Sequence, residues 1–220
     1  MPTIASVFDS LASDYDAWFD GEGKSVFATE IQAFRSVLEL LPKPWLEIGV
    51  GSGRFAQALG IETGLDPSLK LVEMARRRGV DAFLGQGEQA PFRGEVFGTA
   101  FVIVTLCFVE SPSMVLREVN RLVKEGGKLV LGLVLRESPW GRFYQARKKE
   151  GHRFYKYATF YGFEEVRSLL EQAGFAIEEV VSTLLQKPGE VRRIESPLKG
   201  LSSDAGFVII VAQRAHGGNR

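Results

Sequence analysis

The fold is decided by the stretch Leu46-Glu47-Ile48-Gly49-Val50-Gly51-Ser52-Gly53. A short apolar run breaks into three alternating glycines and then into a helix-like segment. Glycine lets the backbone adopt left-handed angles, and it removes the Cβ atoms that would keep a ligand away from the chain. The stretch therefore predicts a strand, a tight loop and a helix, with the loop shaped to hold a nucleotide-like ligand.

Length and composition predict one globular domain. The chain has 220 residues, and its 27 basic side chains equal its 27 acidic ones, so bulk charge gives no reason to expect a nucleic-acid partner. No apolar run reaches the ~18 residues of a membrane span, and the start Met1-Pro2-Thr3 lacks a secretory pattern. We therefore expect a cytoplasmic protein. The single cysteine, Cys107, cannot form an internal disulfide and is expected to be a small buried apolar residue.

Hydrophobic periodicity predicts alternating strands and helices around the glycine loop. A first strand leads into the glycine loop. Further strands are predicted at 62–65, 81–84, 100–109, 128–135, 175–184 and 206–213, and helices at 24–41, 55–59, 69–78, 112–123 and 163–173. The expected fold class is α/β, a Rossmann-like doubly wound sheet of seven strands, mostly parallel with an antiparallel last strand and with helices on both faces. Two segments do not fit the alternation: an aromatic and basic one at 138–161, and a polar one at 186–203 that is expected to be a mobile connection.

The residues after the glycines argue against two common nucleotide sites. A dinucleotide fingerprint needs a third glycine or alanine where this chain has Arg54, and its acidic residue stands ~20 positions on, whereas Asp66 follows Gly49 by 17. A phosphate-cradling P-loop needs a lysine followed by serine or threonine, which is also missing. A ligand with a pyrophosphate or triphosphate is therefore disfavoured.

The stretch at 46–53 resembles the first motif of class I S-adenosylmethionine-dependent methyltransferases, in their small-molecule, type 11 or UbiE-like branch. Further segments in the expected order are similar to later parts of that family, and the N-terminal Phe8-Asp9 and 15–19 look like its lid opening. The later segments are Gly64-Leu65-Asp66-Pro67-Ser68, the loop at 85–92, and the helix and turn at 116–127. The resemblance covers roughly residues 8 to 135.

The resemblance implies one methyltransferase domain over 1–220, with S-adenosyl-L-methionine as cofactor, S-adenosyl-L-homocysteine as product and no metal. It divides the domain into an N-terminal helical lid (1–41), a cofactor-binding core (44–135), a substrate lid insertion (136–161) and a C-terminal helix and strand pair (162–214). The cofactor-binding residues that it implies are Glu47, Gly49, Gly51, Gly53, Asp66, Pro67, Gln86, Gly87, Glu88, Thr105 and Leu106.

Two of these carboxylates have competing explanations. Asp66 before Pro67 would suit a helix N-cap, but a carboxylate at a strand end can also bind the two ribose hydroxyls, and both roles can coexist. Glu47 at the end of the first strand would meet either the cofactor ammonium, solvent or nearby backbone donors. Glu88 is equally well explained as a solvated loop carboxylate.

Aromatic residues are the candidates for covering the sulfonium and the acceptor. Tyr15 and Trp18 could do so because aromatic faces attract cations, or they could simply pack a helix. The substrate lid would contribute Trp140, Phe143 and Tyr155, and the basic run at 147–149 is more consistent with a solvated face than with a nucleic-acid patch.

Methyl transfer from a sulfonium depends mainly on alignment, so no catalytic residue is required by the chemistry. His152 is the weak candidate for a general base, and the other histidine, His216, lies near the C-terminus. A small-molecule acceptor and a monomer or homodimer are expected. The alternatives are an NAD-dependent oxidoreductase, or a protein that binds S-adenosylmethionine without turnover.

Overall fold

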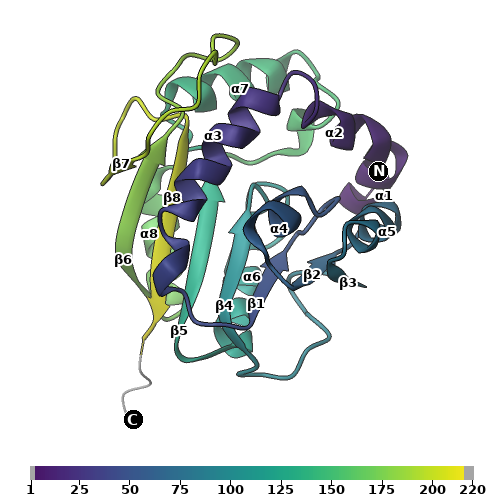
Figure 1. Cartoon of the computed structure of the whole chain (residues 1–220), viewed down its shortest axis with the longest axis vertical. Helices are drawn as coiled ribbons and strands as arrows, with labels where there is room; N and C mark the ends of the chain where they lie inside the picture. Colours follow the sequence, from purple (N-terminus) through teal and green to yellow (C-terminus); the bar gives the residue numbers. More distant parts are fainter. Residues whose placement is uncertain (1–2, 216–220) are drawn as a thin grey trace.

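The computed structural model describes residues 3–215, which form one eight-stranded sheet flanked by helices (Figure 1). The strand order is β3-β2-β1-β4-β5-β8-β6-β7, in which β3, β2, β1, β4 and β5 are parallel neighbours and β8 is antiparallel to both β5 and β6. The strands are β1 (Trp45–Ile48), β2 (Thr63–Asp66), β3 (Asp81–Leu84), β4 (Phe97–Ile103), β5 (Val123–Leu133), β6 (Phe175–Thr183), β7 (Leu198–Lys199) and β8 (Phe207–Arg214).

Helices cover both faces of this sheet. One face packs against α3, α4 and α5 and the other against α6 and α8, and each face has its own apolar cluster. The α-helices are α1 (Ile4–Ser10), α2 (Ala12–Trp18), α3 (Lys24–Arg35), α4 (Arg54–Leu59), α5 (Leu69–Arg77), α6 (Pro112–Leu122), α7 (Pro139–Lys149) and α8 (Phe163–Gln172), and two 3-10 turns are η1 (Leu38–Leu40) and η2 (Tyr155–Tyr157).

Three segments meet over the carboxyl ends of the parallel strands: α1 and α2, the glycine loop after β1, and α7 with η2 (Figure 1). Side chains of α2 contact the glycine loop directly, and the backbone N–H of Thr159 donates to the carbonyl of Cys107 in the loop after β4. In open α/β sheets ligands bind beyond these strand ends, where the strand order reverses. Here the order reverses between β1 and β4, which places a ligand site beside the glycine loop.

The predicted fold class is confirmed, with one more strand than expected. The additional strand is β7, two residues within the polar segment 186–203, which pairs with β6 at the edge of the sheet. Ser111 is the N-cap of α6, and its hydroxyl accepts a hydrogen bond from the backbone N–H of Met114.

Three predicted boundaries are wrong. The helix expected over 24–41 ends at Arg35, and the last turn before Pro42 is the separate 3-10 turn η1. The strand expected over 100–109 runs from Phe97 to Ile103. The predicted turn at 125–127 lies inside β5, at a register irregularity against β4, so β5 begins at Val123 instead of Lys128.

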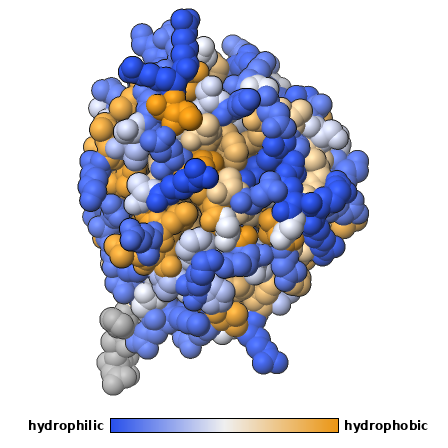
Figure 2. Space-filling view, viewed as in Figure 1, coloured by the Kyte–Doolittle hydropathy of each residue, from blue (hydrophilic) through white to orange (hydrophobic). Residues whose placement is uncertain are grey.

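Asp66 is one candidate for the N-cap of the following helix, but α5, which starts at Leu69 as predicted, has a different N-cap. Its N-cap is Ser68, whose hydroxyl accepts from the backbone N–H of Leu71, so Asp66 does not cap the helix and Pro67 is not its first residue. No helix within residues 3–215 has the length and apolar content to cross a membrane. On the face shown in Figure 2, hydrophilic side chains surround smaller hydrophobic patches.

Candidate cofactor and acceptor site

The glycine loop is held in a conformation that side chains would not permit. Gly49, Gly51 and Gly53 have φ of 75°, 53° and 83°, in the left-handed region that glycine adopts without strain. A Cβ on Gly49 would lie 2.2 Å from the Thr105 hydroxyl, and one on Gly53 would lie 2.8 Å from the Ala75 Cα of α5. The glycine loop therefore packs tightly against Thr105 on one side and against α5 on the other.

Thr105, a predicted cofactor-binding residue, is one of the residues that pack against the loop. Its hydroxyl lies 2.9 Å from the Ile103 carbonyl and 3.3 Å from the Gly49 carbonyl, so it ties the loop after β4 to the glycine loop. Leu106, the next predicted residue, is buried and lines the large cavity beside the loop. The two residues thus connect the loop to that cavity.

Asp66 lies at the carboxyl end of β2, directly beside the glycine loop. Its two carboxylate oxygens accept hydrogen bonds from the backbone N–H groups of Gly51 at 2.8 Å and Ser68 at 2.9 Å. Burial raises the pKa of Asp66 to about 6 despite these two bonds. Each oxygen keeps a further lone pair, so the carboxylate can still accept hydroxyl protons from a ligand.

Glu47 is a buried carboxylate with one unpartnered oxygen. Glu47 is 1% exposed. Its carboxylate accepts a hydrogen bond from the backbone N–H of Ala56 in α4, while the oxygen Oε2 has no hydrogen-bond partner in the described chain. Burial and the nearby Asp66 raise the pKa of Glu47 well above its usual range. A cation beside Oε2 would remove this cost.

The three predicted adenine-side residues follow β3. Gln86 is exposed and forms an isolated bridge with Gln89, and Gly87 packs so closely on Ile48 that a Cβ would lie 2.7 Å from its side chain. Glu88 is half-buried and accepts from the backbone N–H groups of Glu110 and Ser111 at 3.2 and 3.3 Å. Glu88 therefore supports the loop before α6 and is still partly exposed to solvent, and its predicted contact with the cofactor stays a prediction.

A cavity of about 350 Å³ lies between the N-terminal helices and the α7–η2 segment, and Tyr15 on its wall packs against Gly51 of the glycine loop. All five residues predicted to meet the acceptor line this cavity: Tyr15, Trp18, Trp140, Phe143 and Tyr155.

These five differ in how freely they could meet a ligand. Phe143 is 40% exposed, whereas Trp140 is 4% exposed, donates from Nε1 to the Gln186 carbonyl and packs on Gly206. Tyr15 reaches furthest toward the loop, because a Cβ on Gly51 would lie 3.2 Å from its hydroxyl.

His152 and Cys107 also line the cavity. The Nδ1 atom of His152 accepts from the backbone N–H groups of Phe154 and Tyr155 at 3.4 Å, and burial with nearby arginines lowers its pKa below its ordinary value. The thiol of Cys107 is only partly covered overall, and burial raises its pKa to about 12, so it stays a thiol at neutral pH. His216 lies outside the described residues.

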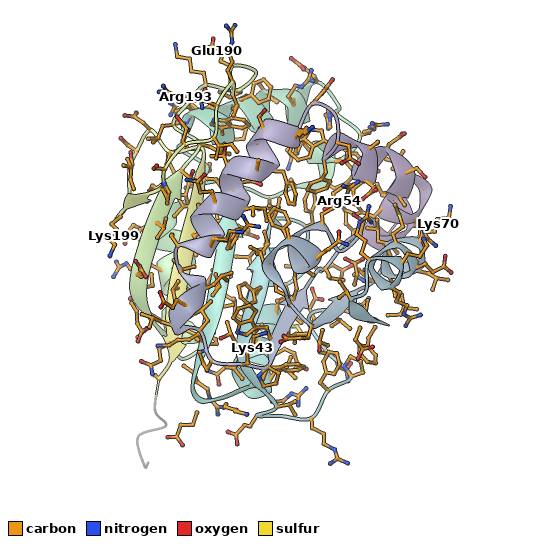
Figure 3. All side chains as sticks on the ribbon, viewed as in Figure 1. Lys43, Arg54, Lys70, Glu190, Arg193 and Lys199 are labelled. Atoms are coloured by element: carbon orange, nitrogen blue, oxygen red, sulfur yellow. The ribbon has the colours of Figure 1, made fainter. Side chains whose placement is uncertain are left out.

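An ion-pair network that the sequence did not reveal joins the lid to the loop. Asp16 of α2 accepts from Arg54 Nε at 2.8 Å, from Arg78 Nη2 at 2.7 Å and from the Ser52 hydroxyl at 2.6 Å. The side chain of Arg54, the first residue of α4, thus reaches the N-terminal helices (Figure 3). Asp16 precedes Arg54 by 38 residues and Arg78 by 62 residues. No local sequence pattern can therefore indicate these contacts, because the fold alone brings the residues together.

A second residue of the site that was not predicted from the sequence is Glu30, which is 6% exposed and lines the cavity. Its position four residues after Val26 and four before Phe34 could have revealed it, since that spacing puts a carboxylate on an apolar helix face. Val104 is the third, because a β-branched residue at φ 50° is an outlier of the kind found at functional sites.

Comparison with known proteins agrees with this geometry. A family model described as "Methyltransferase domain" matches residues 46–131, which run from β1 through the glycine loop and into β5. An uncharacterized protein of Mycobacterium tuberculosis is 43% identical over 208 residues, which are 93% of this chain and 73% of that protein. A demethylmenaquinone methyltransferase of Corynebacterium kroppenstedtii is 27% identical over 135 residues, 58% of each chain.

A solved structure from Thermotoga maritima is similar along nearly the whole chain. It is described as a SAM-dependent methyltransferase, possible histamine N-methyltransferase, and it is 38% identical, with a TM-score of 0.89 over 96% of this chain and 99% of that one. Fold, glycine loop, family model and this relative agree. The chain belongs to the S-adenosylmethionine-dependent methyltransferases.

Proposed function

We propose that this enzyme transfers the methyl group of S-adenosylmethionine to a small-molecule acceptor that binds in the cavity beside the glycine loop. The observation that carries the proposal is the position of Tyr15, which lines the cavity and also covers Gly51. A ligand on the loop and a ligand in the cavity would therefore meet at this residue. The cavity volume of about 350 Å³ suits a small molecule and not a folded partner.

The residues around the loop fit the cofactor. The unpartnered Oε2 of Glu47 would hold the ammonium of its methionine part, and Asp66 would hold the ribose hydroxyls. Gln86, Gly87 and Pro67 would lie on the nucleoside side, since they follow β3 and β2 at the same sheet edge. When bound, the cofactor supplies a methyl group already activated by the positive sulfonium.

The chain's own part is then to position the acceptor and exclude water. Aromatic walls bury the acceptor and remove competing water from the line of attack. Leu106 and Tyr15 separate the cavity from the glycine loop, so they would set the approach of the acceptor. His152 has a lowered pKa and a free Nε2, which keeps it a weak candidate for proton removal where the acceptor must lose a proton.

The relatives' descriptions name two different acceptor chemistries. One is a quinone ring, in the demethylmenaquinone methyltransferases, and the other is an amine, in the Thermotoga protein. Neither name transfers directly to this chain. The nature of the acceptor must therefore be inferred from the cavity itself.

The first test is a thermal-shift series with S-adenosylmethionine, S-adenosylhomocysteine and NAD. A ligand that binds only the folded state at 100 times its Kd stabilises it by about 2.7 kcal/mol, which raises Tm by roughly 5–10 °C in a chain of this size. The first two ligands should produce such a shift and NAD should not. A shift with NAD alone would overturn the proposal.

The second test is transfer of a labelled methyl group to a panel of small metabolites and RNA. Label in a small molecule supports the proposal. Label in RNA alone would contradict the small-molecule acceptor.

A further inference from the structure

The side of α3 that faces the cavity carries an acidic residue. Val26, Glu30 and Phe34 follow one another at four-residue spacing on this helix, and all three are buried, at 7%, 6% and 0% exposure. Val26 and Phe34 belong to the apolar cluster on this face of the sheet. Glu30 thus interrupts an apolar stripe at a place where leucine or methionine would pack without cost.

Glu30 has no partner in the described chain. No hydrogen bond or ion pair of its carboxylate is found within residues 3–215. Its oxygens are not among the fully covered atoms that lack a partner, so the carboxylate keeps contact with the cavity, and burial of the residue raises its pKa to about 8. An ionised carboxylate that is buried without a partner is among the most costly groups in a protein. Its carboxylate lines the cavity, so a ligand there could supply the missing partner.

The wall around Glu30 is aromatic and suits a cation. Trp18, Tyr144 and Tyr155 line the same cavity, and the rings of Tyr144 and Tyr155 lie 4.4 Å apart with their hydroxyls hydrogen-bonded to each other. Burial is the main cause of the raised pKa values of Tyr15, Tyr144 and Tyr155, and the nearby charge of Glu30 raises each of them further. Aromatic faces attract a desolvated cation through the negative charge of the ring face.

The basic side chains of the cavity lie elsewhere and already have partners. Arg153 pairs with Asp14, which also lines the cavity, and Arg147 lies 3.8 Å from Glu150 with its guanidinium over the Phe143 ring. The remaining charged group that faces the cavity is Glu22, which is acidic. Neither arginine forms an ion pair with Glu30.

We propose that Glu30 binds a positively charged nitrogen of the methyl acceptor, so that the acceptor is an amine or a protonated nitrogen heterocycle with an apolar body. The inference rests on the proposed function, because it assigns the substrate class of the same cavity. The carboxylate would provide a charge-assisted hydrogen bond to the nitrogen, and the aromatic rings would cover the remaining hydrocarbon.

A quinone-like acceptor is the rival, and the two differ in the sign of their pH dependence. An ammonium binds the ionised form of Glu30, so its affinity should rise as the pH increases through about 8. A carbonyl would accept a proton from the neutral form, so its affinity should fall over the same range. His152 has a lowered pKa, while Tyr15, Tyr144, Tyr155 and Cys107 have raised ones, so none of these titrates in this window.

The test is calorimetric binding of two probes of matched shape, 2-phenylethylamine and 2-phenylethanol, to the protein saturated with S-adenosylhomocysteine, with menadione as the quinone probe. We expect the amine to bind at least about tenfold more tightly than the alcohol at pH 8.5, and its affinity to be lower at pH 6.5. Glu30→Gln keeps the shape of the side chain and removes the charge. This variant should lose both the preference for the amine and the pH dependence.

The matched control is Glu39→Gln, the same change at an exposed position in the 3-10 turn after α3, which should leave amine affinity within twofold of the parent. Preference for the alcohol or for menadione, absence of amine binding, or an unchanged preference in Glu30→Gln would overturn the inference. Folding is checked by Tm in each variant. Failure of S-adenosylhomocysteine itself to bind would instead contradict the proposed function, so the two outcomes are separable.

Discussion

Asp66 connects two parts of the cofactor site through one carboxylate. It accepts from the Gly51 N–H in the glycine loop and from the Ser68 N–H at the start of α5, and it lies where the ribose is expected. We predict that Asp66→Ala lowers affinity for S-adenosylhomocysteine by about 10- to 100-fold, because a charge-assisted hydrogen bond contributes ~1.5–3 kcal/mol. Isothermal titration calorimetry measures the change.

The control for this prediction is Ser68→Ala. It removes the N-cap of α5 and should cost about 1 kcal/mol of stability while the cofactor affinity stays close to that of the parent. If both variants bind S-adenosylhomocysteine like the parent, Asp66 has only a role in holding the backbone.

Glu30 should also affect stability in the absence of any ligand. Its pKa is about 8 in the folded protein and ~4.3 in an unfolded chain, so the folded state holds the proton more tightly. Its contribution to the free energy of unfolding is therefore fully present below about pH 4.3 and is lost as the pH rises to about 8.

Glu30→Gln removes this dependence. We predict that its Tm exceeds that of the parent by several degrees at pH 8.5 and by little at pH 5, since each kcal/mol corresponds to about 2–4 °C. Differential scanning calorimetry at the two pH values is the measurement, with Glu39→Gln as the comparison at an exposed position. An equal Tm difference at both pH values would show that Glu30 does not titrate in this range.

The residue scale also shows what a single sequence can and cannot reveal. Gly49, Gly51 and Asp66 were predictable because their roles depend on neighbours in the chain or on a fixed place at a strand end. Glu30 carried a local signal, a carboxylate in an apolar helix stripe, that is ambiguous until the cavity beside it is known. The contacts of Asp16 depend on residues up to 62 positions away and carried no signal at all.

At the scale of elements, α2 is fastened to the glycine loop mainly through Asp16. Its side chain is 13% exposed and contacts Arg54, Arg78 and Ser52, and these hydrogen bonds hold the pKa of Asp16 far below its usual range. We predict that Asp16→Asn loosens α2, with a loss of about 1–3 kcal/mol of local stability, because two partly buried guanidinium groups lose their shared anion. Amide hydrogen exchange of residues 12–18 should become faster.

Asp20→Asn provides the comparison on the same guanidinium. Asp20 also pairs with Arg54, but its side chain is 72% exposed, and exposed pairs contribute little. Exchange in α2 should therefore stay close to that of the parent. If the two variants behave alike, the burial of the Asp16 network does not hold the lid.

Element types were easier to predict than element ends. The apolar run at 100–109 continues past the end of β4 because Val104 lines the cavity, while Leu106 lines the cavity and also belongs to an apolar cluster, so hydrophobicity alone could not show where the strand stops. The strand begins at Phe97, three residues before the predicted start, and includes Gly98. In the structure a Cβ at Gly98 would lie 2.4 Å from the Pro42 carbonyl oxygen, so the glycine allows the preceding loop to pack against the strand.

At the scale of the whole molecule, one sheet carries both apolar clusters. Alternate residues of β5 point to opposite faces, with Val130 in one cluster and Leu129 and Leu131 in the other. Neither cluster can lose its packing without exposing strands that the other also covers. Residues 3–215 are therefore expected to unfold as a single cooperative unit, in agreement with the single domain predicted from the chain length.

The three tryptophans lie at places that test this cooperativity. Trp18 is in α2, Trp45 is in β1 and Trp140 is in α7, so single-tryptophan variants made by Trp→Phe changes report on the lid, the sheet and the segment over the cavity separately. We predict that urea midpoints from Trp45 and Trp140 fluorescence coincide with the midpoint from far-ultraviolet circular dichroism, because both residues belong to the same apolar cluster. A Trp140 transition at clearly lower urea, with Trp45 unchanged, would instead identify 136–161 as a separately folding insertion.

Trp18 is only packed against that apolar cluster. An unfolding transition of Trp18 at lower urea would show that the N-terminal lid opens before the sheet unfolds, and S-adenosylhomocysteine should then shift this transition to higher urea.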